Sequence, residues 1–163
     1  MASPAPEPGS SPTAPTLKVS VTDQQERLRL DYRWLKELAR AVLAEEGVAA
    51  AQVNVVLLSD AAIQDVHRRF LNQDTPTDVI TFPLSSPGAK KLQAEILIST
   101  DTAAAAATDH GGHAPEQEVA LYLVHGLLHL CGYDDHEPDD RAAMRQREAA
   151  HLAQFGIRLD SDF

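Results

Sequence analysis

Hydrophobic and polar residues repeat with two different periods along this chain. Leu17, Val19 and Val21 alternate with polar residues, which predicts a half-buried strand over residues 17–23. Short apolar runs predict further strands over 53–59, 79–82 and 94–100. Apolar residues at helical spacing predict helices over 31–46, from 60 onward, over 101–108, over 118–131 and from 138 onward. The pattern alternates between strand and helix at first and becomes helical toward the C-terminus.

Turn and capping residues mark the ends of several of these elements. Gly47 follows the first helix, and glycine is common just after a helix end. Asp60 is a suitable N-cap for the second helix, and Pro138 suits the first position of the last one. Among the aromatic residues, Trp34 and Phe70 are expected in the core.

The order of the elements predicts an α+β fold, in which a small mixed sheet packs against helices in a single domain. Residues 1–16 contain five prolines among small and polar residues, a composition that predicts a disordered tail. We expect the folded domain to span 17–156, and residues 157–163 to form a short C-terminal tail.

Charge and cysteine content narrow the classes of function. The formal net charge of −10 excludes a broad basic surface, so contact with nucleic acid would depend on a local patch or a metal ion. Cys131 is the single cysteine, so the chain can form no internal disulfide and a reducing compartment is expected. No apolar run approaches the roughly 18 residues of a membrane span, and the N-terminus lacks the pattern of a signal peptide. We expect a cytoplasmic protein.

Two histidines on the most apolar helix are candidate metal ligands. His125 and His129 are four residues apart, so their side chains project from one face at a separation that one ion can bridge. A helix that is apolar on nearly every side is buried, which places both imidazoles deep in the domain. Buried imidazoles need polar partners, and a metal ion supplies one for both. The pair alone is also compatible with histidines satisfied within the core.

The turn after this helix offers two candidates for a third ligand. Gly132 can adopt a left-handed conformation that ends the helix and returns the chain toward the histidines. Asp135 and His136 both follow in this turn, and zinc accepts either side chain at about 2.0–2.2 Å. Asp134 is a candidate for orienting a ligand. Three protein ligands with an open fourth position are typical of a catalytic zinc site.

Three segments resemble one known family. HGLLHLCGYDDH resembles the signature His-Gly-x-Leu-His-Leu-x-Gly-Tyr-Asp-His of the YbeY family, bacterial rRNA maturation factors that are metal-dependent endoribonucleases. DTPTDVITFP and AEILIS resemble two further blocks of that family, in the same order and spacing over about residues 17–156. The resemblance implies a single-strand-specific, zinc-dependent endoribonuclease with one Zn²⁺ per chain. It also implies maturation of the 3′ end of 16S rRNA and late-stage quality control of the 70S ribosome.

The chain departs from the family pattern at three positions. Asp135 stands where the third histidine is expected, and His136 comes one residue later. Spacing favours Asp135 as the third ligand, whereas the ligand preference of zinc favours His136, so both stay candidates. Ala94 replaces a usual glycine beside the cleft, and Leu71 replaces a frequent arginine.

Other polar residues have both a functional and a structural interpretation. Arg68 and Arg69 could partly replace the missing arginine in phosphate contact, or form an exposed helix face with His67. Glu95 could line the cleft, or be solvated on an edge strand. A loop over residues 109–115 contains His110 and His113, which could be extra metal ligands or solvated side chains. Cys131 is expected to pack in the core rather than to bind zinc, and Thr77 and Asp78 to fix their loop by hydrogen bonds.

The residue after the first histidine restricts the chemistry. Zinc proteases with a His-Glu-x-x-His helix carry their general base there, and this chain has Gly126. RNA needs no such base, because its own 2′-OH can attack and a metal ion can assist. The expected partners are rRNA and the small ribosomal subunit, with a ribosomal protein or a GTPase to compensate for the acidic surface, and no DNA or membrane. The alternatives are a non-catalytic ribosome-assembly factor with a structural zinc and a metal-dependent hydrolase of another substrate.

Overall fold

A four-stranded mixed sheet forms the centre of the fold. In the computed structural model, which describes residues 14–73, 77–109 and 114–159, the strands stand in the order β1-β2-β4-β3. β1, β2 and β4 are parallel, and β3 is antiparallel to β4. The strands are β1 Thr16–Asp23, β2 Ala50–Leu58, β3 Val79–Pro83 and β4 Leu92–Ser99. Within the described residues, β3 is therefore an edge strand and β4 an interior one.

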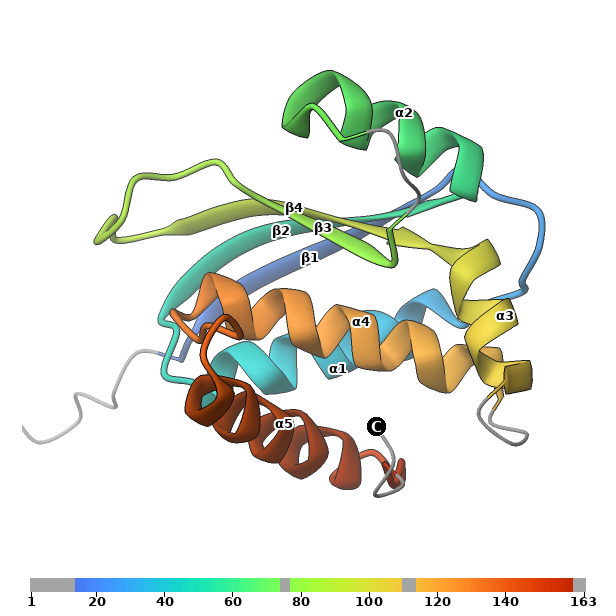
Figure 1. The fold of residues 1–163 in the computed structure, drawn as a ribbon. Helices are drawn as coiled ribbons and strands as arrows, with labels where there is room; N and C mark the ends of the chain where they lie inside the picture. The colour runs from blue at the N-terminus through green and yellow to red at the C-terminus, as the bar shows by residue number, and fades with distance from the viewer. Residues whose placement is uncertain (1–13, 74–76, 110–113, 160–163) are drawn as a thin grey trace, which may run out of the picture.

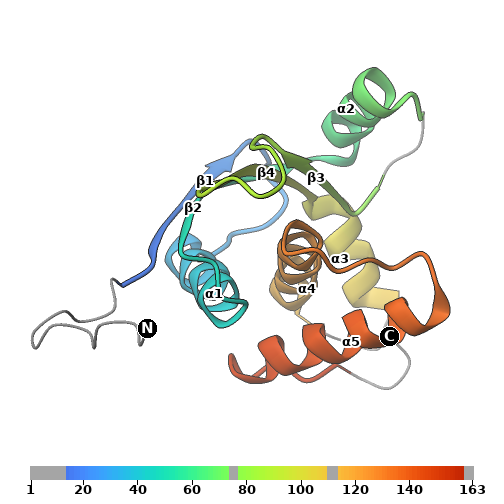
Figure 2. The ribbon, with the colours of Figure 1, turned by 90° about the vertical axis from the view of Figure 1, so that its left-hand side faces the viewer.

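Helices cover the two faces of this sheet unequally. α2 lies alone on one face, α1 and α4 lie on the other, and α5 packs on the outside of α4 (Figures 1 and 2). α3 lies at one end of the sheet and packs against α4. The helices are α1 Tyr32–Glu45, α2 Asp60–Leu71, α3 Thr100–Asp109, α4 Pro115–Leu130 and α5 Pro138–Ala153. α4 is thus enclosed between the sheet and α5.

The main core lies between the sheet, α1 and α4. Alternate residues of β2, namely Val53, Val55 and Leu57, face α1 and α4 and are at most 1% exposed. A second, smaller core under α2 contains Ile63 and Leu97. Burial of apolar side chains on the inner face contributes about 25 cal/mol for each Å² removed from water, so the main core supplies most of the stability.

The structure confirms the predicted α+β fold and the order of all nine elements over the described residues. Asp31 caps α1 by accepting a hydrogen bond from the backbone N–H of Trp34, and Gly47 follows its end with a φ of 83°. The predicted cap of α2 was wrong by one residue. Ser59 caps this helix, and Asp60 is its first residue.

Two predictions about aromatic packing have different outcomes. Trp34 is partly buried and packs against the main core, edge to face with Phe155. Phe70 is 71% exposed, so its predicted place in the core was wrong. It lies in the last turn of α2, where its ring stands edge to face against Phe82 of the edge strand β3.

Within the described residues, packed elements begin near residue 17 and continue beyond residue 156. β1 begins at Thr16, one residue before the predicted start, and most of the predicted N-terminal tail lies outside the described residues. At the other end Ile157 is 5% exposed within the main core, and Leu159 packs against it. Packing therefore continues past residue 156. None of the helices in the described ranges combines the length and the apolarity that a membrane span requires.

Candidate metal centre

The C-terminal end of α4 presents both histidines at the rim of the core. Gly126 lies against the sheet, where an added Cβ would stand 3.1 Å from Ile96 Cγ2 and from Thr81 Oγ1. With this side of α4 on the sheet, His125 and His129 turn toward an open cleft and keep 26% and 31% of their side-chain surface exposed. They are half-buried, so the prediction that they lie deep in the domain was wrong.

The turn after α4 brings an aspartate to the two imidazoles. Gly132 adopts a φ of 100°, and Tyr133 donates its backbone N–H back to Leu128 O. The chain then folds over the end of the helix. As a result Asp135 Oδ2 lies 3.5 Å from His125 Nε2 and 3.6 Å from His129 Nε2.

Three potential ligand atoms therefore form a triangle with sides close to those of a zinc site. The two Nε2 atoms of His125 and His129 are 3.1 Å apart, and the sides to Asp135 are 3.5 and 3.6 Å. Ligands at about 2.0–2.1 Å from a tetrahedral zinc ion are separated by roughly 3.3–3.4 Å. The donor set and its spacing fit one ion of this size.

His136 lies outside this triangle. Its side chain is 83% exposed, and its Nε2 is 3.4 Å from Asp134 Oδ1. The same Asp134 oxygen accepts the backbone N–H groups of Asp135 and His136, at 2.7 and 3.3 Å. Asp134 thus holds the turn that carries Asp135. A second group of potential ligands, formed by Asp134, Asp135 and His136, lies on the solvent side of the turn.

In both imidazoles, the partner of Nδ1 determines which ring nitrogen carries the hydrogen. His125 Nδ1 lies 3.0 Å from Glu148 Oε1, and His129 Nδ1 lies 3.1 Å from Tyr133 O. Carboxylate and carbonyl oxygens accept hydrogen bonds, so both Nδ1 atoms carry the hydrogen. In the neutral rings both Nε2 lone pairs then point toward each other and toward the carboxylate of Asp135. Three acceptors that converge on one point favour a shared cation between them, either a proton or a metal ion.

The charges around His125 favour a cation at this position. Burial acts to lower the pKa of this imidazole, but the hydrogen bond to Glu148 and the charges of Glu148, Asp135 and Asp78 outweigh burial and raise the pKa above its ordinary value. The same negative charges attract any other cation that binds at the ring. The electrostatic field of the site therefore suits a divalent metal ion.

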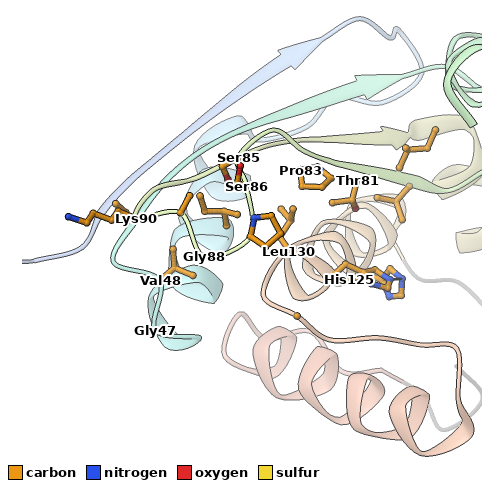
Figure 3. A pocket seen from close by; sticks show the side chains of 18 of the residues that line it. Gly47, Val48, Thr81, Pro83, Ser85, Ser86, Gly88, Lys90, His125 and Leu130 are labelled. Atoms are coloured by element: carbon orange, nitrogen blue, oxygen red, sulfur yellow. Dashed lines mark hydrogen bonds between the residues drawn. The ribbon is translucent and has the colours of Figure 1, made fainter.

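Two clefts meet at His125. The larger one, of about 1000 Å³, extends from the triangle between β3, the β3–β4 hairpin and the end of α4, with Thr81 and Pro83 on its wall and Lys90 at its far end (Figure 3). The smaller one, of about 160 Å³, lies toward α5. His125 and Asp78 line both. An elongated substrate in the larger cleft would pass directly over the candidate metal ligands.

Comparison with known proteins identifies the family. The sequence model of a family described as Endoribonuclease YbeY matches residues 20–156. The chain belongs to this family. An endoribonuclease YbeY from Moorella thermoacetica is 37% identical, over 87% of this chain and 99% of its own length. Another from Rhodopirellula baltica is 41% identical, over 77% of this chain but only 64% of its own length.

A solved structure agrees with the fold. The solution structure of TM1509 from Thermotoga maritima matches with a TM-score of 0.59 and 24% identity, covering 86% of this chain and 92% of that protein. At this identity the likeness concerns the fold alone. Together, these comparisons confirm the predicted YbeY family and the predicted class of enzyme, an endoribonuclease.

Within this YbeY fold, several predicted site residues lie away from the triangle. Glu95 is on β4, an interior strand, so its predicted edge position was wrong. It shares the α2 face of the sheet with its pairing partner Phe82, whereas Ala94 is buried on the α4 face. Arg68 and Arg69 are exposed and both form ion pairs with Asp65.

The remaining predicted residues have structural positions or lie outside the described chain. Cys131 packs against the core, burial raises the pKa of its thiol to about 11, and it belongs to neither group of potential ligands found in the described residues. Asp78 accepts the backbone N–H of Val79 at 2.8 Å, as predicted for its loop, and Thr77 donates to Asp78. His110 and His113 lie outside the described residues.

Sequence reasoning missed the residues that hold the two imidazoles in place. Glu148 is 3% exposed and reaches His125 from α5, in the helical row of the buried Met144 and His151. A glutamate in an apolar row of a helix was the signal that could have identified it. Tyr133, whose carbonyl oxygen holds His129, donates its hydroxyl to Glu46 at 3.0 Å.

Glu46 is the centre of a polar network that fixes α5 against α1. Arg147 donates to Glu46 Oε1, and His151, which is 2% exposed, has its Nε2 2.7 Å from the same oxygen. Burial acts to raise the pKa of Glu46, but hydrogen bonds with His151, Arg147 and Tyr133 outweigh it and lower the pKa below its ordinary value. The network links α1, α5 and the turn that carries Asp135.

Proposed function

We propose that this chain is a zinc-dependent endoribonuclease specific for single-stranded RNA. Its proposed roles are maturation of the 3′ end of 16S rRNA and late-stage quality control of the 70S ribosome. Family membership supports the class of enzyme. The proposal of zinc rests on the convergence of His125 Nε2, His129 Nε2 and Asp135 Oδ2, with both Nδ1 atoms engaged elsewhere.

The donor set supports zinc with Asp135 as the third ligand. Two imidazoles and one carboxylate with an open fourth position are typical of catalytic zinc sites, and the open cleft leaves this position accessible. His136 points away from the two imidazole nitrogens, in contact with Asp134. Zinc held by these three residues would act as a Lewis acid toward a phosphoryl oxygen of RNA.

The chain itself contributes binding and orientation. The larger cleft can align a single strand across the triangle, and its volume of about 1000 Å³ leaves room for unpaired bases. Glu148 keeps the hydrogen of His125 on Nδ1, so that Nε2 stays a ligand. The absence of a carboxylate after the first histidine disfavours peptide hydrolysis, because Gly126 packs on the sheet where a glutamate side chain does not fit. In RNA the neighbouring 2′-OH can supply the nucleophile.

We further propose that a ribosomal protein or a GTPase helps to bring the enzyme to the small subunit. The net charge of −10 opposes binding to the rRNA backbone over most of the surface. A protein partner would supply affinity that this surface does not.

A comparison of wild type with three variants, His125→Ala/His129→Ala, Asp135→Ala and His136→Ala, tests the proposed function. Purified wild type is expected to hold one zinc ion and to cleave a single-stranded rRNA fragment, and a chelator should abolish cleavage. The His125→Ala/His129→Ala double variant should lose both zinc and cleavage, which also controls for contaminating nucleases. His136→Ala is the matched control and should keep both, because the His136 side chain is exposed outside the triangle.

The outcomes separate this proposal from its rivals. Full cleavage by the double variant would contradict it. Zinc that is held without any cleavage of RNA would favour a ribosome-assembly factor with a structural ion. Loss of zinc in His136→Ala together with its retention in Asp135→Ala would assign the third ligand to His136.

A further inference from the structure

An unpartnered arginine lies beside the candidate metal centre, on the side away from the large cleft. Arg145 of α5 lines the smaller cleft together with His125 and Asp135. Its side chain is exposed, and it forms no hydrogen bond or ion pair with any of the described residues. A guanidinium that lines a site without a protein partner is available to a ligand.

Three other arginines are less suited to this role. Arg141 also lines the smaller cleft, but it donates to His136 O at 3.3 Å and so braces the turn after α4. Arg68 and Arg69 are paired with Asp65 on α2. Leu71 supplies no charge to the larger cleft that it lines. Among these arginines, Arg145 is therefore the one whose guanidinium N–H groups have no partner in the described residues.

We propose that Arg145 is a phosphate-binding residue, which grips the RNA backbone on the α5 side of the scissile bond. The inference rests on the proposed function, because it takes RNA as the substrate. A guanidinium matches a phosphate group in geometry and can donate two parallel hydrogen bonds to its oxygens. One molecule takes up roughly 30 Å³ in liquid water. The cleft of about 160 Å³ is several times larger, so a phosphate group has room there.

The charges of the smaller cleft make this contact dependent on zinc. Its three carboxylates, from Asp78, Asp135 and Glu148, outnumber the guanidinium groups of Arg141 and Arg145 by one. With the His125 imidazole neutral and no metal ion bound, the cleft therefore carries one net negative charge, which opposes the binding of phosphate. Zinc adds two positive charges and reverses the sign. Arg145 and the ion would then bind neighbouring oxygens of the backbone.

The position of the cleft also determines which part of the substrate Arg145 would touch. The two clefts meet at His125 and Asp78, next to the three potential ligand atoms. A strand that enters along the larger cleft and places a phosphodiester over the ligands continues into the smaller one. Arg145 would hold the phosphate at or just beyond the bond that is cut, while the larger cleft holds the other side.

Salt-dependent binding of RNA tests this assignment. The probe is a fluorescein-labelled single-stranded uridine oligomer with 2′-O-methyl sugars. Its binding is followed by fluorescence anisotropy, and its integrity is checked after each titration. Loss of one phosphate contact to a single strand lowers the slope of log K against log salt concentration by about 0.7. Arg145→Ala with zinc bound should show this change and bind roughly tenfold more weakly. Arg145→Lys should keep the slope of wild type and have an intermediate affinity, because lysine keeps the charge but not the fork.

The control is Arg33→Ala, which removes another exposed arginine, one that pairs with Glu37 on α1 and lines neither cleft. Its slope and affinity should equal those of wild type. Wild type stripped of zinc should bind the oligomer with the slope of Arg145→Ala or a lower one. Zinc content and thermal unfolding of every variant show whether the fold and the ion are retained.

The results distinguish this inference from the proposed function. Equal slopes for zinc-loaded Arg145→Ala and Arg33→Ala would overturn the role of Arg145 and leave the endoribonuclease proposal intact. If Arg145→Ala showed the predicted lower slope and affinity while the wild type held zinc but cleaved no RNA, the phosphate contact would be supported. The endoribonuclease proposal would be contradicted. Wild type that binds no zinc would overturn both.

Discussion

Replacing Glu148 by glutamine tests how strongly α5 controls the candidate metal centre. Glu148 is almost fully buried, and its Oε1 accepts the Nδ1 hydrogen of His125 at 3.0 Å. The amide oxygen of glutamine can accept the same hydrogen bond, so the shape of the site is retained. The negative charge is lost, and with it the part of the hydrogen bond that makes His125 a better ligand.

The expected loss of zinc affinity follows from the strength of this hydrogen bond. A hydrogen bond to a charged group contributes about 1.5–3 kcal/mol and one between neutral groups about 1 kcal/mol. The difference of about 0.5–2 kcal/mol corresponds to roughly 2- to 30-fold weaker binding of zinc. Glu148→Ala removes the hydrogen bond as well and should approach about 100-fold.

Competition with a chromophoric chelator measures this change directly. The matched control is Glu137→Gln, because Glu137 is exposed at the start of the same helix and makes no side-chain cap. Its zinc affinity should equal that of wild type. If Glu148→Gln bound zinc as tightly as the control while the zinc-free proteins unfolded at equal temperature, the orienting role of Glu148 would be refuted.

Three further predictions concern stability and reactivity. Glu46→Gln should lower the free energy of unfolding by roughly 3 kcal/mol at neutral pH, because it breaks a buried charged network. The pKa of Glu46 is lowered in the fold. Its contribution to the free energy of unfolding is therefore present above its ordinary pKa of 4.5 and is lost as the pH falls through the lowered pKa. Denaturant titrations over this pH range should show a shallower acid limb in the variant. The Cys131 thiol, with a pKa of about 11, should react with a thiol reagent at pH 8 much more slowly in the native protein than in denaturant, and equal rates would show that it is not buried. Gly126→Val should cost about 1–3 kcal/mol in chemical unfolding, because its side chain would press on Ile96 and Thr81; unchanged stability would mean that α4 can move off the sheet.

Local patterns were sufficient to predict most elements and the histidine pair. The apolar residues of α4 repeat on nearly every side, and the helix is buried along almost its whole length, as expected. The spacing of His125 and His129 places their rings 4.6 Å apart on one face. Helix periodicity and capping act over a few residues, so the sequence alone contains this information.

Long-range packing explains what could not be predicted. The order of the strands depends on pairings between distant segments, so nothing near Glu95 showed that β3 would pair outside β4. Phe70 continues the apolar row of Ile63, but the end of α2 extends past the edge of the sheet. Similarly, Glu148 comes to His125 from 23 residues further along the chain, through the packing of α5 on α4.

An anomalous diffraction map collected at the zinc absorption edge, from crystals of the zinc-loaded protein, would test the central claim most directly. The account predicts one strong peak within about 2.0–2.2 Å of His125 Nε2, His129 Nε2 and an oxygen of Asp135, with His136 outside the coordination sphere. A peak coordinated by His136 in place of Asp135 would contradict the assignment of the third ligand. The absence of any peak at the two histidines in a map that shows zinc elsewhere would contradict the metal centre itself.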